Sequence, residues 1–224
     1  MSAASIPYIR RPRPTLWLLR GGELACEEVR AIYISKSPVT NDEYEAYMPE
    51  HERGPTSAGD DQPAVNVSFA EATEYCRRYG EASGKPFRLP TELEWEYACR
   101  AEVDQRYFWG DRPEDGDAYC WDQTTSDGRC RSIEVGKPND YGLYDMLGNV
   151  WEWTSSPYEA CSRAAGHAGH EASLSSRIDD LQGARVLRGG SFRTPRVDIG
   201  CAARLPGEPT ERRDDIGFRI VRFL

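Results

Sequence analysis

Two carboxylates flank a glycine turn in Tyr141–Trp153, the stretch of the chain richest in aromatic residues. Asp145 and Glu152 lie on either side of Gly148. Calcium prefers carboxylate and main-chain carbonyl oxygens, so such a pair beside a tight turn predicts a calcium site. The same carboxylates could instead cap backbone N–H groups of the turn. The spacing alone does not separate these two interpretations.

The residues around the two carboxylates predict a rigid, buried loop. Gly142, Gly148 and Asn149 are residue types that tolerate positive φ or close backbone approach. The large apolar side chains that the loop can bury are Tyr144, Met146, Val150, Trp151 and Trp153. The turn residues and the apolar residues therefore support one buried loop.

The cysteines and histidines give weaker signals. Cys161, His167 and His170 have ligand types that suit a transition metal, but a Gly/Ala/Ser-rich segment is a poor rigid support for one. The seven cysteines include no CxxC pair, and we expect most of them to be small buried thiols. Cys120 and Cys130 could form a bridge in an oxidising compartment, although reduced thiols are the stronger expectation.

Composition limits the classes of partner. The chain has 224 residues and a net charge of −9, which fits one domain and argues against a nucleic-acid or anionic-membrane surface. It contains no apolar run of about 18 residues, the length that predicts a membrane span. The first residues lack the apolar core of a signal peptide. We therefore expect a cytoplasmic protein with neither a nucleic-acid nor a membrane partner.

Three helices are predicted by one repeated signal, a Ser or Thr followed three residues later by Glu. This capping box occurs at Thr40, Ser68 and Thr91. The second helix shows an apolar face at helical spacing and should end at Gly84. The helices together occupy a small part of the chain, so the remainder must consist of strands and long loops.

Strands are predicted near both ends of the chain. Residues 1–14 suggest a flexible basic arm, followed by a single domain over residues 15–224. Residues 15–19 suggest a strand with a hairpin partner at 30–34. Residues 185–192 suggest a strand that runs into a Gly-Gly turn, and 216–223 a closing strand that buries Ile216, Phe218, Ile220 and Val221. Long loops separate these elements.

The order of several motifs resembles the formylglycine-generating enzyme, or sulfatase-modifying factor, superfamily. These motifs are Pro38-Val-Thr-Asn41, Pro63–Ser68, Arg88–Ala98, Phe108-Trp-Gly110, Pro138-Asn139, Tyr141–Trp153, Arg188-Gly-Gly-Ser191 and Gly217-Phe-Arg219. The resemblance implies an α+β fold, a variant of the C-type-lectin fold with small twisted β-sheets, about three short helices and much irregular loop. It also implies structural calcium, with side chains of Asp145 and Glu152 and carbonyl oxygens of Gly148 and Val150 as ligands.

The resemblance fails where the family's copper site should be. Formylglycine-generating enzymes carry two cysteines shortly after the Arg-Gly-Gly-Ser motif, and thiolates suit copper(I), a soft metal. Here Thr194 takes the first position, the second falls in a shortened loop, and Cys201 matches a different position of the family. We therefore expect no copper site and no formylglycine-generating activity.

Two functions remain open after this departure. The first is a non-catalytic binding or regulatory domain that recognises a protein partner; the alternative is a metal-dependent oxidoreductase or maturation enzyme with a different metal site. We favour the first, through the surface of residues 192–215 and the adjoining loop 154–183. The predicted ligand- or partner-binding residues are Trp109, Ser191, Arg193, Arg196, Arg204 and Asp215. A simpler interpretation makes Arg188, Arg204 and Arg219 ion-paired framework residues.

Overall fold

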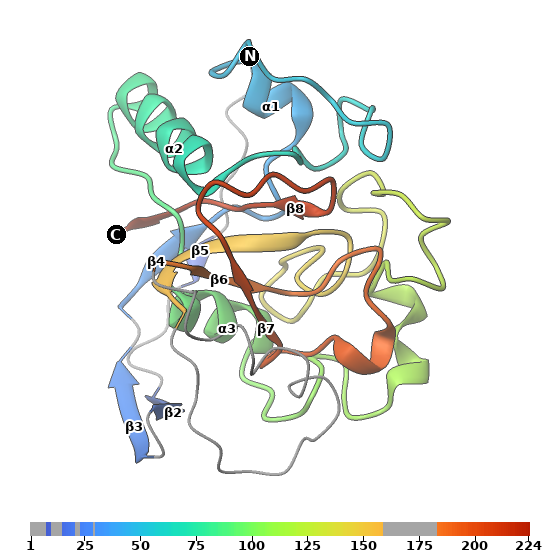
Figure 1. Ribbon diagram of the computed structural model, residues 1–224. Helices are drawn as coiled ribbons and strands as arrows, with labels where there is room; N and C mark the ends of the chain where they lie inside the picture. The colour runs from blue at the N-terminus through green and yellow to red at the C-terminus, as the bar shows by residue number, and fades with distance from the viewer. Residues whose placement is uncertain (1–7, 10–14, 21–22, 29, 159–182) are drawn as a thin grey trace.

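The computed structural model describes residues 8–9, 15–20, 23–28, 30–158 and 183–224. Within them the strands form three small sheets, and α-helices pack at the sides of the largest sheet (Figure 1). Much of the chain between residues 101 and 150 is irregular, although many of its side chains are buried. The structure is of the α+β class that the sequence predicts. No helix among the described residues has the length and apolar character needed to cross a bilayer.

The three predicted helices are confirmed together with their capping boxes. They are α1 (Asn41–Glu45), α2 (Phe69–Ser83) and α3 (Glu92–Arg100). At each start, the N-cap hydroxyl accepts from the N–H of the glutamate three residues on, and that glutamate accepts from the N-cap N–H. Helix α2 ends at Gly84, whose φ of 67° is the left-handed conformation that glycine adopts without strain.

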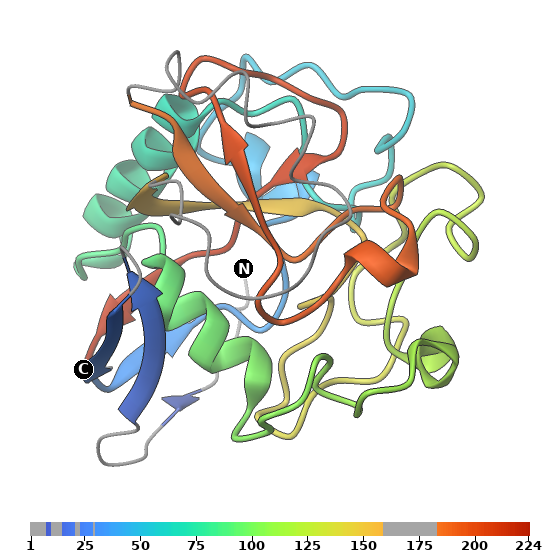
Figure 2. The ribbon, with the colours of Figure 1, turned by 60° about the horizontal axis from the view of Figure 1, so that its bottom comes forward.

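The largest sheet has strand order β7-β6-β5-β8 and lies at the centre of the molecule (Figure 2). Strand β5 (Trp151–Pro157) pairs antiparallel with β6 (Arg185–Arg188) and parallel with β8 (Ile216–Gly217). Strand β7 (Arg204–Gly207) forms the outer edge on β6. Helix α3 packs against β5 and β6, so the loop that leads into β5 is enclosed.

The other two sheets correct two strand predictions. Strand β2 (Thr15–Arg20) pairs with β3 (Glu23–Glu28), so the predicted hairpin between 15–19 and 30–34 is wrong. Strand β4 (Ile32–Ile34) instead lies between β1 (Tyr8–Ile9) and β9 (Val221–Phe223). The predicted closing strand is divided, with β8 in the central sheet and β9 in this one. Its four predicted inward residues are all buried.

The core of the described residues has two large apolar clusters and a small third one, which contains Val65, Cys130, Val150 and Phe192. One large cluster surrounds Trp95 of α3 and includes Met146 and Leu147 of the aromatic loop. The other large cluster surrounds Trp153 of β5 and includes Phe218 and the buried face of α2. The Tyr141–Trp153 stretch contributes to both large clusters, so most of the predicted buried loop is confirmed, but Tyr144 is only half-buried and Trp151–Trp153 belong to β5. Gly142, Gly148 and Asn149 all have positive φ, as their residue types predict.

Candidate functional site

The Glu152 carboxylate lies at the centre of a buried ion-pair network. It is fully buried on β5. Its Oε2 accepts from Nε1 of Trp95 at 2.6 Å and from Nε of Arg219 at 2.7 Å, while Oε1 accepts from Nη2 of Arg219 at 2.8 Å. Arg219 also donates to the carbonyl of Tyr144 at 3.1 Å. Helix α3, the aromatic loop and the C-terminal segment therefore meet at one carboxylate.

Asp145 is a second buried carboxylate, but it has no cationic partner among the described side chains. Its Oδ2 accepts from the backbone N–H of Glu134 at 3.0 Å. Burial raises the pKa of Asp145 to about 6, and the nearby Glu152 carboxylate adds to this effect, while the Glu134 N–H and Arg219 oppose it. Arg219 is therefore the one guanidinium near two buried carboxylates, and its ion pair is with Glu152. A bound cation would remove this imbalance.

The main chain next to these carboxylates leaves two oxygen atoms unused. No described hydrogen bond ends on the carbonyl oxygens of Gly148 and Val150. Gly148 has a φ of 79°, and a Cβ at this position would lie 2.4 Å from the carbonyl oxygen of Trp121, so only glycine fits. No group of three or more His, Cys, Asp or Glu side chains suited to a metal occurs in the described part of the chain. Any cation here would depend on these carbonyl oxygens as well as on side chains.

Arg196 on the 3-10 helix η4 (Arg196–Asp198) is anchored in the protein rather than displayed on its surface. Its side chain is 11% exposed, and its Nε donates to the fully buried Asp122. Its Nη1 donates to Asp117 at the end of the 3-10 helix η1 (Pro113–Ala118). The two short helices lie side by side in Figures 1 and 2. Arg196 is therefore a structural cation that joins two loops.

Trp109 lies in an aromatic stack beside the same arginine. Its ring is nearly parallel to those of Tyr107, at a centroid distance of 4.7 Å, and Tyr119, at 5.6 Å. A Cβ on Gly116 would lie 2.7 Å from the Trp109 ring and 3.3 Å from Arg196, so the two side chains meet across this glycine. The structure thus brings together two of the predicted binding residues. Trp109 remains half-buried.

Ser191 and Asp215 form a separate, buried contact. The Ser191 hydroxyl donates to Oδ2 of Asp215 at 2.8 Å, and the Asp215 carboxylate also accepts two bonds from Arg213. Thr194 closes the turn that follows Ser191, because its Oγ1 accepts from the Ser191 N–H at 3.0 Å. The hydroxyl at the expected copper position therefore has a structural role.

The remaining predicted binding residues lie apart from one another. Arg193 is about half exposed and pairs with Asp214 at 2.5 Å. Arg204 is on the edge strand β7 and pairs with Glu92 of α3 at 2.8 Å. The six predicted residues thus do not form one site. Of the other predicted groups, Cys161, His167 and His170 lie outside the described residues, as does most of the 154–183 loop.

Arg188, Arg204 and Arg219 are ion-paired, which confirms their interpretation as framework residues, but the sequence did not identify the partner of Arg188 or the contact of Cys201. Arg188 is 1% exposed; it pairs with Glu96 and donates to the carbonyls of Cys201, Ala202 and Ala203. Its neighbour Cys201 lies against Cys99, with sulfur atoms 3.5 Å apart. Cys120 and Cys130, for which reduced thiols were the stronger expectation, are free thiols in two different core clusters. Because these contacts join distant segments, short spacing in the sequence could not reveal them.

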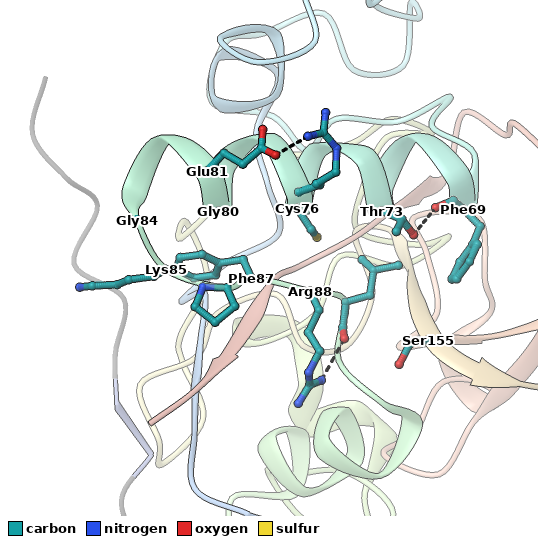
Figure 3. A pocket seen from close by; sticks show the side chains of 13 residues that line it. Phe69, Thr73, Cys76, Gly80, Glu81, Gly84, Lys85, Phe87, Arg88 and Ser155 are labelled. Carbon is teal, nitrogen blue, oxygen red and sulfur yellow. Dashed lines mark hydrogen bonds and ion pairs between the residues drawn. The ribbon is translucent and has the colours of Figure 1, made fainter.

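A pocket of about 620 Å³ lies along α2, and none of the predicted site residues lines it. Figure 3 shows it between α2 and residues 85–89, with Ser155 at one end. Phe69, Cys76 and Phe87 give it an apolar lining. Arg77 at its rim is neutralised by Glu74 and Glu81. The pocket therefore contains no grouping of side chains that indicates a reaction.

The family model and the similar curated proteins all point to the same family. Residues 22–224 match the family described as sulfatase-modifying factor enzyme 1-like domain. The formylglycine-generating enzyme of Bos taurus is 33% identical over 189 residues, which cover 76% of this chain and 47% of the relative. The inactive C-alpha-formylglycine-generating enzyme 2 of Bos taurus is 33% identical over 178 residues, which cover 71% and 50%. The chain thus spans about half the length of these curated relatives.

A solved structure shares the fold. The structure of Treponema denticola variable protein 1 has a TM-score of 0.80 and 22% sequence identity, and the match covers 97% of this chain and 94% of that one. At this identity the likeness concerns the fold alone. It agrees with the arrangement of small sheets, short helices and long loops described above.

Proposed function

This chain belongs to the sulfatase-modifying factor enzyme 1-like domain family, with that family's variant of the C-type-lectin fold, and we propose that it acts as a non-catalytic domain that binds a protein partner. The observation that carries the proposal is the turn after Arg188-Gly-Gly-Ser191. Thr194 occupies the expected cysteine position, and its hydroxyl accepts from the Ser191 N–H. A bis-thiolate copper site needs sulfur ligands that this turn does not provide.

Two further facts support a binding role. One relative at 33% identity is named as an inactive formylglycine-generating enzyme, so the family includes members described without that activity. In this chain, the residues after Ser191 are held by the buried contacts of Ser191 with Asp215 and of Arg196 with Asp122. Loops held on a rigid scaffold are common recognition surfaces.

The structure refines which residues such a surface can use. Arg193 is exposed and can reach a partner, whereas Arg196, Ser191 and Asp215 are mostly buried and would act by fixing the loop. Arginine is enriched among the residues that dominate interface energies. We therefore propose Arg193 as the residue of this loop that contacts the partner.

Two experiments test the proposed function: capture of a protein partner, and an assay for formylglycine formation. Arg193→Glu should abolish capture of a specific protein by the full chain, while its melting temperature stays within about 1 °C of the wild type, since surface pairs contribute little. Arg77→Glu is the matched control, an ion-paired arginine of similar exposure on α2. Mass spectrometry should show a sulfatase-type cysteine peptide unchanged after incubation with copper-loaded protein and oxygen. Conversion to formylglycine, or capture unaffected by Arg193→Glu, would contradict the proposal.

We also propose a structural calcium held by Asp145 and by the carbonyl oxygens of Gly148 and Val150. The fit rests on Asp145, a buried carboxylate without a cation, and on the two unused carbonyl oxygens. Glu152 fits less fully, because its Oε2 already accepts two described hydrogen bonds and its Oε1 accepts one, so that only Oε1 keeps an unused lone pair. Calcium here would neutralise buried charge and hold the loop; it would take no part in a reaction.

A further inference from the structure

The pocket along α2 is a long groove on one face of the helix. Its residues on α2 recur every three or four positions, which is the spacing of a single helix face. They are Phe69, Thr73, Cys76, Arg77, Gly80, Glu81 and Gly84, the residue that ends the helix. At 1.5 Å per residue, this face is about 22 Å long. Residues 85–89 form the opposite wall (Figure 3). The groove therefore suits an elongated ligand.

The centre of the groove is apolar. Cys76 lines it from α2, and Phe87 and Leu89 line it from the opposite wall. Burial raises the pKa of Cys76 to about 12, so its thiol stays neutral and gives an apolar surface. Glu81, the one carboxylate among the described lining residues, is paired with Arg77 at 2.5 Å. An alkyl chain would cover this surface and leave water.

An arginine without a carboxylate partner lies at the Phe69 end of the groove. Arg185 of β6 holds its guanidinium over the Phe69 ring, 4.7 Å from the centroid, and its Nη1 donates to the carbonyl of Ser155 at 3.0 Å. Phe69 and Ser155 both line the groove. Within the described part of the chain, Arg185 has no ion pair, and its Nε has no hydrogen-bond partner. This guanidinium is therefore fixed in place and its charge is uncompensated.

The other cations of the groove are less suited to hold an anion. Arg77 is neutralised by Glu74 and Glu81 on α2, and Arg88 is paired with Glu94. Lys85 is exposed at the opposite end, beside Gly84 (Figure 3). A solvated ammonium on a flexible stem binds a carboxylate less specifically than a fixed guanidinium, whose planar fork matches the two oxygen atoms. Arg185 therefore marks the end of the groove where a negative group would bind.

We propose that this groove binds a free fatty acid, an alkyl chain that ends in a carboxylate. The chain lies along α2 against Cys76, Phe87 and Leu89, and the carboxylate accepts charge-assisted hydrogen bonds from Arg185. Arg185 is partly exposed, so such a ligand can reach it. The site does not depend on the binding of a protein partner through Arg193, which does not line the groove.

The test is calorimetric titration of the full chain with dodecanoate, kept below the concentration at which it forms micelles. Wild-type protein should bind one equivalent. Arg185→Gln should weaken this binding by about tenfold to a hundredfold, the loss expected when hydrogen bonds to a charged group are removed. Dodecanol has the same chain without the charge. It should bind the wild type more weakly than dodecanoate does, and Arg185→Gln should change its affinity little.

The control variants locate the ligand. Arg78→Gln removes an ion-paired arginine of α2 that does not line the groove, and it should bind dodecanoate as the wild type does. Arg193→Glu should also bind it normally, so a loss of partner capture and a loss of fatty-acid binding are distinguishable. Thr73→Trp fills the groove from an exposed helix position and should weaken both ligands, which tests the site even if Arg185→Gln does not fold.

Three results would overturn the proposal. They are a wild-type protein that does not bind dodecanoate, an Arg185→Gln variant that binds it with unchanged affinity, and a Thr73→Trp variant that binds it as the wild type does.

Discussion

At the scale of single residues, the arginines of this chain fall into an exposed group and a buried group with different roles. The sequence groups Arg193 and Arg196 on one partner surface, yet their environments differ. Arg193 is about half exposed and pairs with Asp214, which is partly exposed. Arg196 is mostly buried and neutralises Asp122, which has no exposed surface. The predicted place of Arg196 on the partner surface is therefore wrong. Its substitution should disturb folding as well as binding.

We predict that Arg196→Ala lowers the free energy of unfolding by about 3–5 kcal/mol, because it leaves a buried carboxylate unpaired. Arg193→Ala should change it by about 1 kcal/mol or less, as is usual for exposed pairs. Urea unfolding of both variants at neutral pH measures the difference. Equal losses in the two variants would show that Arg196 is not a structural cation.

Asp122 should also make stability depend on pH. Burial alone would raise the pKa of Asp122, but the bonds from Arg196 and Thr124 outweigh it and lower the pKa. A carboxyl whose pKa is lower in the folded protein stabilises the fold at every pH above its pKa in the unfolded chain, which is about 3.9 for Asp. This stabilisation is lost as the pH falls through the pKa of the folded state. Asp122→Asn should therefore cost most stability at neutral pH and progressively less below pH 4. A cost that is the same at pH 7 and pH 3 would contradict this assignment.

At the scale of elements, the helix starts can be tested most directly. Ser68→Ala should lower the free energy of unfolding by about 1 kcal/mol, because the N–H of Glu71 loses its acceptor at the start of α2. Thr73→Ala in the same helix is the control; its exposed hydroxyl only bonds back to the Phe69 carbonyl. This change should be neutral or slightly stabilising. Chemical denaturation of the two variants measures both effects.

The helices were predictable because their signals are local. Each capping box lies within four residues, and the structure confirms all three. Strand partners were not predictable in the same way. Residues 15–19 have the composition of a strand, but whether they pair with 23–28 or 30–34 depends on contacts that lie outside the segment. The division of residues 216–223 between two sheets has the same cause.

In the candidate sites, too, local features were predictable from the sequence and contacts between distant segments were not. The loop around Gly148 was predictable because turn residues and apolar residues alternate within one short stretch. The contact of Cys99 with Cys201, and that of Arg188 with Glu96, join residues about a hundred positions apart. A single sequence contains no spacing that indicates such pairs.

At the scale of the whole molecule, calcium should determine stability. A ligand that binds only the folded state raises the free energy of unfolding by mass action. Chelation should therefore lower the melting temperature of the wild type, and added calcium should restore it. In Asp145→Asn, which keeps the shape of the side chain but removes its charge, chelation should have little effect. An unchanged wild-type melting temperature after chelation would exclude the site. Adding magnesium instead of calcium to the chelated protein tests whether the site is selective for calcium.

The pairing of β4 with β9 has a consequence for how the chain is made in the cell. Ile32 of β4 pairs with Phe223, and Ile34 pairs with Val221. During translation, the ribosome synthesises β4 early, but its partner emerges only after nearly two hundred further residues. The nascent chain must therefore keep an unpaired, apolar strand edge throughout most of its synthesis, and such edges favour aggregation. We expect this chain to need chaperone protection on the ribosome until β9 has emerged.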